Sequence, residues 1–97
     1  MNTPQAFHGC VGSAFIVPTD SGPLELRLAS VAERAEPGQF KQFSVFFHGP
    51  ADRVLPQGTY EFRSAARSPF ALFIVPVQSS TAERIVYEAC FSVEVTA

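Results

Sequence analysis

Apolar and polar residues alternate along most of this chain in short runs, and turn-forming residues separate the runs. In LELRLASV (24–31), leucine occupies positions 24, 26 and 28, and the residues between these leucines are charged. A period of two is typical of a strand with one face toward a core and the other toward solvent. The alternation therefore predicts an antiparallel all-β domain. Six strands are expected, at 13–17, 24–31, 43–48, 59–64, 70–76 and 85–95.

The connections between these runs carry the residues that turns favour. PTDSGP (18–23) and QSSTAE (78–83) are expected to be turns, because Pro, Gly, Asp and Ser each favour a turn conformation. AERAEPGQFKQ (32–42) is polar and contains its own Pro-Gly pair, so it is expected to be a polar connection.

The segment ahead of the first strand predicts a short helix. Thr3 and Pro4 suit the N-cap and the first helical position, and Gly9 is a stop signal. A single helical turn at 3–9 would carry Phe7, whose ring could plug the open end of a sheet.

Six short strands with short connections fold either as a small barrel or as a two-layer sandwich. Closure removes the free strand edges that invite aggregation, so the barrel is the favoured architecture. We expect a six-stranded, partly open antiparallel barrel in which most strands pair with their neighbours along the chain. The whole of 1–97 is expected to form one domain, because this length supports a single core.

The composition agrees with a packed domain. The chain has 97 residues, of which 46% are hydrophobic and 16% charged, and this argues against disorder. Ten phenylalanines and no tryptophan indicate an aromatic core that fills a small barrel.

Charge and hydropathy exclude two classes of partner. The formal net charge is −2 and the seven basic residues are scattered singly, so nucleic acid is not an expected partner. No apolar run approaches the ~20 residues of a membrane-spanning helix, and the amino terminus lacks a secretory signal pattern. A cytoplasmic location is expected. There Cys10 and Cys90, the only cysteines, are expected to be reduced and buried.

Some strands carry large apolar residues on both faces, whereas a small barrel should have a polar outer row. In one interpretation the short helix and the 32–42 connection cover this second face. In the other, which we prefer slightly, the second face is an interface with a second copy in a two-fold homodimer, or with another protein. The residues expected to form this interface are Phe46, Phe73, Val75 and Val86.

HGPADRVLPQGTY (48–60) is the main candidate for chemistry, because His48 and Asp52 flank a turn. A histidine beside a carboxylate can act as a general base. The possible nucleophiles, Ser44 and Cys10, lie on other elements, and no nucleophile motif accompanies them.

A structural corner explains the same stretch better. Gly49-Pro50 and Pro56-Gln57-Gly58 are expected to mark turns, with glycine supplying positive φ, and Asp52 suits the capping of a turn over 52–55. No catalytic residue is therefore predicted.

A metal site is not predicted either. His8, Cys10 and His48 are the candidate ligands, but their spacing is unlike that of structural zinc sites and no fourth ligand is evident. No glycine-rich phosphate loop is present, so no cofactor is expected.

Several stretches resemble a family of small bacterial domains of unknown function: VGSAF, LELRLASV, FSVFFHGPADRVLPQGTYEF, LFIVPV and YEACF. The resemblance extends from Phe7 to Phe91, and L-P-Q-G-T-Y is its most specific element. It implies an all-β domain without an assigned activity. It also implies an association with tail-collar-type phage genes.

The sequence therefore predicts a non-catalytic structural or protein-interaction module, accessory to a phage-tail-like assembly. The alternative is a small-molecule-binding β-barrel with its site near the 49–58 loop. An enzyme is the third hypothesis and rests on His48 and Asp52 alone, so the protein is not expected to be an enzyme.

Overall fold

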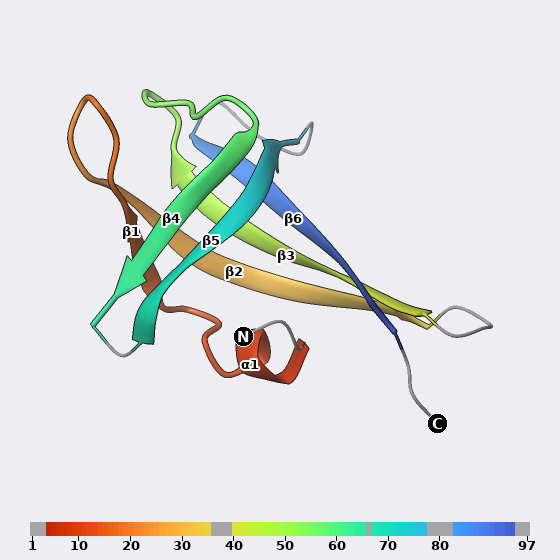
Figure 1. Ribbon diagram of the computed structural model, residues 1–97. Coiled ribbons are helices and arrows are strands. Elements are labelled where there is room, and N and C mark those ends of the chain that lie inside the picture. The colour runs from red at the N-terminus through yellow and green to blue at the C-terminus, as the bar shows by residue number, and fades with distance from the viewer. Residues whose placement is uncertain (1–3, 36–39, 66, 78–82, 95–97) are drawn as a thin grey trace.

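The computed structural model describes residues 4–35, 40–65, 67–77 and 83–94 (Figure 1). Six antiparallel strands form a closed barrel in the order β1-β2-β3-β6-β5-β4, which confirms the all-β barrel with one short N-terminal helix. Two of the contacts that close the ring are short: β1 meets β4 at Ile16 and Arg63, and β5 meets β6 over two residue pairs. The elements are α1 (Pro4–His8), β1 (Ala14–Val17), β2 (Leu24–Ala35), β3 (Phe40–Pro50), β4 (Gly58–Ser64), β5 (Arg67–Pro76) and β6 (Arg84–Glu94).

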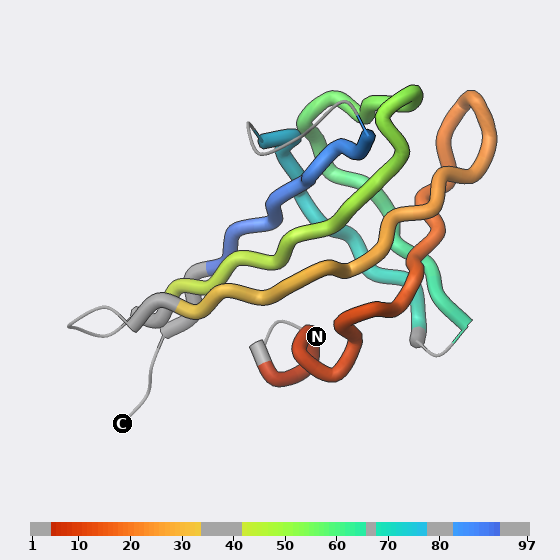
Figure 2. Tube along the Cα trace, turned by 180° about the vertical axis from the view of Figure 1, so that it is seen from behind, coloured from red at the N-terminus to blue at the C-terminus, as the bar shows by residue number. Residues whose placement is uncertain are grey.

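Strands β2, β3 and β6 form a long ribbon that extends past the β4–β5 hairpin (Figures 1 and 2). β3 and β6 pair without a bulge from Phe40 opposite Glu94 to Pro50 opposite Arg84. β3 and β4 are neighbours in sequence but not in the barrel, so the connection between them crosses one end of it.

The expectation of a polar connection at 32–42 was wrong. β2 continues to Ala35 and β3 begins at Phe40, so most of this segment is paired strand; residues 36–39 lie outside the described residues. The segment extends a ribbon that projects beyond the barrel, where polar side chains can meet solvent, and its polarity therefore does not prevent pairing.

The barrel interior is filled by the inward residues of the alternating pattern. Phenylalanine rings dominate it: the ring centroids of Phe47 and Phe62 are 4.9 Å apart, and those of Phe15 and Phe47 are 6.0 Å apart, nearly at right angles. Edge-to-face and offset arrangements are the favourable ones for aromatic pairs. The core residues on the strands include Phe15, Val17, Leu24, Leu26, Leu28, Phe43, Val45, Phe47, Phe62, Leu72, Ile74, Tyr87 and Ala89.

Helix α1 plugs one end of the barrel through Phe7, as the sequence predicted. Phe7 is fully buried, and its ring centroid lies 5.4, 6.1 and 6.4 Å from those of Phe91, Phe43 and Phe70. The helix is also held from outside, because Nε2 of His8 lies 3.0 Å from a carboxylate oxygen of Glu33 on β2.

Gly49 has a role that the sequence did not predict. It lies within β3 and its φ is not positive; among the described residues only Gly12 and Gly22 have positive φ. A Cβ at position 49 would lie 2.6 Å from Leu26 Cδ2 and 3.2 Å from Tyr87 Cε2. The expectation that Gly49 serves a turn was therefore wrong: it is a strand glycine that leaves room for two core side chains.

Candidate functional site: the outer face of β3, β5 and β6

The outer face is the side of β3, β5 and β6 that points away from the core. Phe73 on β5 is 53% exposed there, while Phe46 on β3 and Val75 on β5 are half-buried. Helix α1 packs against the end of the barrel that Phe7 plugs, so it does not cover this face. The described residues of the 32–42 segment belong to β2 and β3, and Phe73 remains exposed, so in the described part of the chain neither the helix nor this segment covers Phe73.

Val86 does not belong to the exposed surface. Its side chain is only 5% exposed, although it lies on the outer row of β6. His48 on β3 lies opposite it, and on the other side the Val77 N–H donates to the Val86 carbonyl at 2.9 Å. Strands on both sides flank Val86. A period of two reveals the face on which a residue lies but not what neighbours cover it, and for that reason the prediction failed here.

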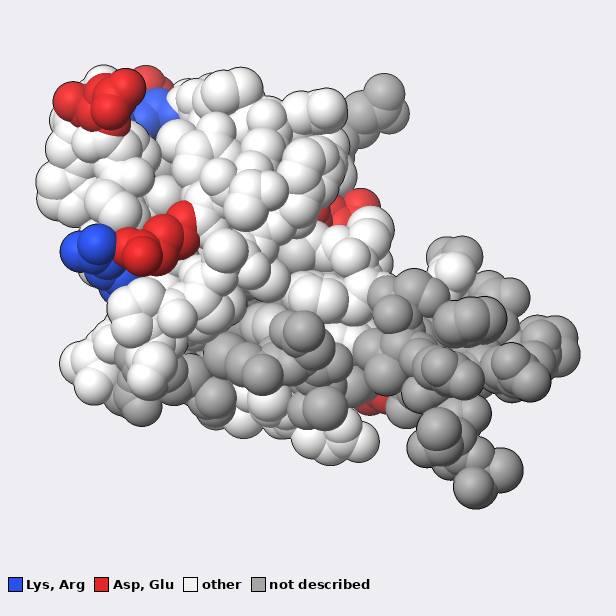
Figure 3. Space-filling model, viewed as in Figure 1, with Lys and Arg blue, Asp and Glu red and all other residues white. Residues whose placement is uncertain are grey.

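A carboxylate divides the apolar residues of the outer face. Glu88 on β6 is paired with Phe46 on β3 and with Val75 on β5, so it lies between their two side chains. The three remaining residues of the predicted interface therefore form two apolar areas. Phe46 lies on one side of Glu88, and Phe73 and Val75 lie on the other. In Figure 3 the visible face is largely uncharged over β4 and β5, and charged side chains gather at its margins.

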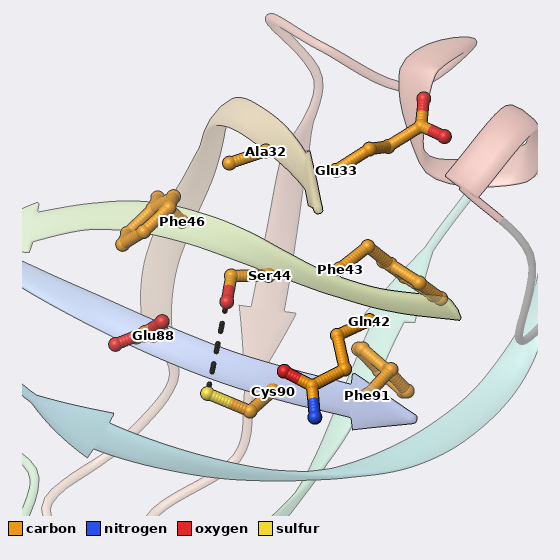
Figure 4. A pocket seen from close by; sticks show the side chains of 9 residues that line it. All are labelled: Ala32, Glu33, Gln42, Phe43, Ser44, Phe46, Glu88, Cys90 and Phe91. Carbon is orange, nitrogen blue, oxygen red and sulfur yellow. Dashed lines mark hydrogen bonds between the residues drawn. The ribbon is translucent and has the colours of Figure 1, made fainter. Parts of the chain in front are cut away.

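A groove of about 520 Å³ runs over the ribbon beside Phe46 and Glu88 (Figure 4). Small side chains lie between these two and Gln42: Ala32, Ser44 and Cys90 come from the three adjacent strands β2, β3 and β6. Ser44 Oγ and Cys90 Sγ are 3.7 Å apart and share a hydrogen bond. Sequence reasoning missed this groove, because its small residues come from three separate segments.

Cys90 is exposed, so the expectation that both thiols are buried is wrong for this residue and correct only for Cys10. Partial burial in the groove, followed by the hydrogen bond and the negative charge of Glu88, raises the pKa of the Cys90 thiol above its ordinary value, while the Ser44 hydrogen bond opposes this shift. A raised pKa keeps the sulfur in the protonated form, which is a poor nucleophile. The Cys90 thiol is therefore not activated as a nucleophile.

The thiol environment predicts how the two cysteines react with a neutral alkylating reagent. Cys90 is expected to be alkylated and Cys10 to be protected, with Cys90 slower than free cysteine at the same pH because less of it is thiolate. Glu88→Gln removes a group that raises the pKa and should accelerate the reaction. Ser44→Ala removes the group that lowers it and should slow the reaction. Mass spectrometry of labelled peptides between pH 7 and 10 measures the alkylation rates of Cys10 and Cys90 in the wild type and of Cys90 in the two variants. Equal rates for Cys90 and free cysteine would contradict this account.

Among the described residues, no hydrogen bond or ion pair joins His48 to Asp52. His48 lies on the outer row of β3 between Arg27 on β2 and Val86 on β6. Its pKa is lowered first by partial burial and then by the positive charge of Arg84. In the catalytic interpretation a carboxylate would orient this histidine and stabilise its charged form, whereas the charge that affects His48 is the positive one of Arg84.

Asp52 and Arg53 instead belong to the corner that closes the other end of the barrel. Arg53 donates to the carbonyl oxygens of Pro23 and Gly22, both at 3.1 Å, and to the Thr19 hydroxyl at 2.9 Å. The Arg53 N–H closes the turn on the Pro50 carbonyl at 3.4 Å. The Arg53 side chain thus joins the 51–57 connection to the 18–23 turn. The turn at 50–53 is closed by the backbone hydrogen bond and not by the Asp52 side chain.

The corner is also joined to the core. The Leu55 N–H donates to the buried hydroxyl of Tyr87 at 2.8 Å, and the Tyr60 hydroxyl donates to the Pro56 carbonyl at 2.7 Å. Burial raises the pKa of Tyr87, although the Leu55 bond opposes that shift. A concave region of about 580 Å³ lies outside this corner, between the 18–21 and 52–56 segments.

Two of the three candidate metal ligands have other contacts. His8 contacts Glu33, and Cys10 belongs to the core. Within the ranges that the structure describes, no three His, Cys, Asp or Glu side chains converge as a metal ion would require.

The fold and this face define a small closed β-barrel with a candidate interaction surface. A family model described as "Domain of unknown function (DUF6916)" matches residues 2–91, so the chain belongs to that family. No curated protein and no solved structure matches the chain. Among the described residues, the only helix is α1, whose five residues are far too few to cross a membrane.

Proposed function

We propose that this domain is a non-catalytic protein-interaction module and an accessory of a phage-tail-like assembly. The observation that carries the proposal is Phe73, a large aromatic side chain that is 53% exposed beside Val75 on the outer face. Burial of such a side chain in a complex stabilises it by roughly 1.5–3 kcal/mol. The phage-tail setting is supported by the resemblance of the L-P-Q-G-T-Y and neighbouring stretches.

The partner that this face fits is a second copy of the chain. A two-fold contact places Phe73 and Val75 of each copy in the interface, so each of these apolar residues is buried twice in one complex. The acidic Glu88 lies beside this area and fits the polar rim that surrounds the apolar centre of most interfaces.

The titratable groups of the face favour binding over bond-making chemistry. The pKa of Cys90 is raised and that of His48 is lowered, so at neutral pH both groups are uncharged. Cys90 is therefore not an activated nucleophile, and His48 is not a charged acid. We place this function in the cytoplasm, where the exposed thiol of Cys90 stays reduced.

Phe73→Asp tests the proposal. Self-association of the wild-type chain through this face should weaken by at least about tenfold in dissociation constant, because each copy loses one buried aromatic ring and gains a desolvated charge. Val54→Asp is the matched control, since Val54 is 55% exposed on the 51–57 connection and away from the outer face. Sedimentation velocity from micromolar to high micromolar concentration measures the change. A wild-type chain that shows no association, or equal effects of the two variants, would contradict the proposal.

The small-molecule alternative ranks second. The 580 Å³ concave region beside the 49–58 loop favours it, but the barrel interior is filled by phenylalanine rings. Arg53, the cation best placed to attract a ligand there, already donates three hydrogen bonds within the protein.

A further inference from the structure

The β6 strand has one paired edge and one largely unpaired edge. On one side it pairs with β3 over its whole length. On the other side it pairs with β5 only at Glu88 and Tyr87, so in the described part of the chain no strand pairs with this edge from Ala89 to Glu94. In Figure 1 the two strands diverge from this point.

The direction of the backbone groups along this edge follows from one hydrogen bond. The Val86 carbonyl accepts from the Val77 N–H at 2.9 Å, so the backbone groups of Val86 point toward the β5 side. Because N–H and C=O groups alternate sides along a strand, those of Cys90, Ser92 and Glu94 point to the unpaired edge. The groups of the residues between them point to β3.

Two other strand edges of the molecule carry protective features that this edge lacks. The β5 edge that diverges from β6 contains Pro69, which has no N–H to offer. The β2 edge beyond β1 has a register shift between Leu28 and Ser30 and is contacted by α1, with the His8–Glu33 pair between them. Ala89–Val93 contains neither proline nor charge, its pairing with β3 has no bulge, and the charged residues Glu88 and Glu94 lie only at the two ends of this stretch. Bulges, prolines and charges are the means by which proteins prevent strand addition at an edge.

We propose that the unpaired edge of β6 pairs antiparallel with the same edge of a second copy. The occupant is a second copy because antiparallel self-pairing is reciprocal: each edge offers the same donors and acceptors, and one two-fold axis satisfies both edges together. The two ribbons then form one continuous sheet, and the outer faces of both copies lie on the same side of it. This contact does not use Phe73 and is independent of the proposed docking face.

Residue-resolved amide exchange by NMR on the wild-type chain tests the pairing directly. At low concentration the amides of Cys90 and Ser92 should exchange fast, and those of Ala89 and Phe91, which face β3, should exchange slowly. When nine tenths of the chain is paired, only about a tenth has a free edge, so exchange at Cys90 and Ser92 should slow by about tenfold. The amides of Ala89 and Phe91 should not change. Fast exchange at Cys90 and Ser92 at every concentration overturns the proposal and leaves this edge to a strand of a different protein.

Proline substitution provides a second test. Cys90→Pro removes an N–H from the unpaired edge and leaves the bonds to β3 intact, so it should abolish the concentration dependence of exchange at Ser92. Cys90→Ala is the matched control and should retain it. Ser92→Pro acts by the same mechanism, with exchange then measured at Cys90, and it replaces Cys90→Pro if that variant does not fold. Retained pairing in a folded proline variant overturns the proposal.

The two surfaces can be separated by combining variants. Phe73→Asp should leave the exchange pattern of the β6 edge unchanged, and Cys90→Pro should leave the association through Phe73 unchanged. The double variant should sediment as a monomer. If Phe73→Asp alone gives a monomer, the edge proposal fails while the docking face stands; if Cys90→Pro alone gives a monomer, the docking-face proposal fails.

Discussion

Replacement of Phe7 by alanine is expected to lower the free energy of unfolding by about 3–5 kcal/mol, the usual cost of removing a fully buried phenylalanine side chain. Phe7 is the aromatic residue of α1, and its ring contacts those of Phe43, Phe70 and Phe91. The loss leaves a cavity at the barrel end and detaches a helix of five residues, which is too short to be stable alone. Total stabilities of small domains are about 5–15 kcal/mol, so the variant should be close to unfolded at room temperature.

Urea denaturation followed by circular dichroism measures this effect. Val11→Ala is the control, because Val11 lies in the same N-terminal segment but is 48% exposed. Its denaturation midpoint should remain near that of the wild type. An equal small shift in both variants would mean that α1 does not plug the barrel.

Gly49→Ala is the second variant with a large expected effect, a loss of about 1–3 kcal/mol. The added methyl group would lie 2.6 Å from Leu26 Cδ2, and Leu26 is fully buried and cannot easily move away. Since the φ of Gly49 is not positive, the backbone itself accepts alanine. The penalty thus comes from overpacking, and it should exceed the ~0.4–1 kcal/mol that Gly→Ala gains by restricting the unfolded chain.

Gly58→Ala is the matched control in the same stretch of sequence. At position 58 the nearest side-chain atom to an added methyl group is Tyr60 Cε2 at 3.6 Å, an ordinary contact. Gly58→Ala should therefore be neutral or slightly stabilising. Thermal unfolding of both variants checks the difference, and similar melting temperatures would show that the core near Gly49 has room to adapt.

The two glycines illustrate how far the sequence carries. Both lie in proline-containing stretches that were expected to mark turns, yet Gly58 is the first residue of β4, and Gly49 lies within β3, packed against Leu26 and Tyr87. Composition cannot distinguish a glycine that needs positive φ from one that needs an absent side chain. The candidate site shows the same limit: the alternation assigned Phe46, Phe73, Val75 and Val86 to one outer row, but only Phe73 among them is mostly open to solvent.

The sequence by itself determined the all-β class, the six strands, the inward row of each strand and the plug formed by Phe7, because these depend on local period and on residue type. Only the tertiary structure decided that Glu88 separates the apolar residues of the outer face, that Val86 is covered and Cys90 exposed, and that β6 keeps an unpaired edge. These features depend on which strands become neighbours and where they diverge. Contacts between β3 and β6 join residues from 34 positions apart, at Pro50 and Arg84, to 54 positions apart, at Phe40 and Glu94, and no local pattern encodes such a pairing.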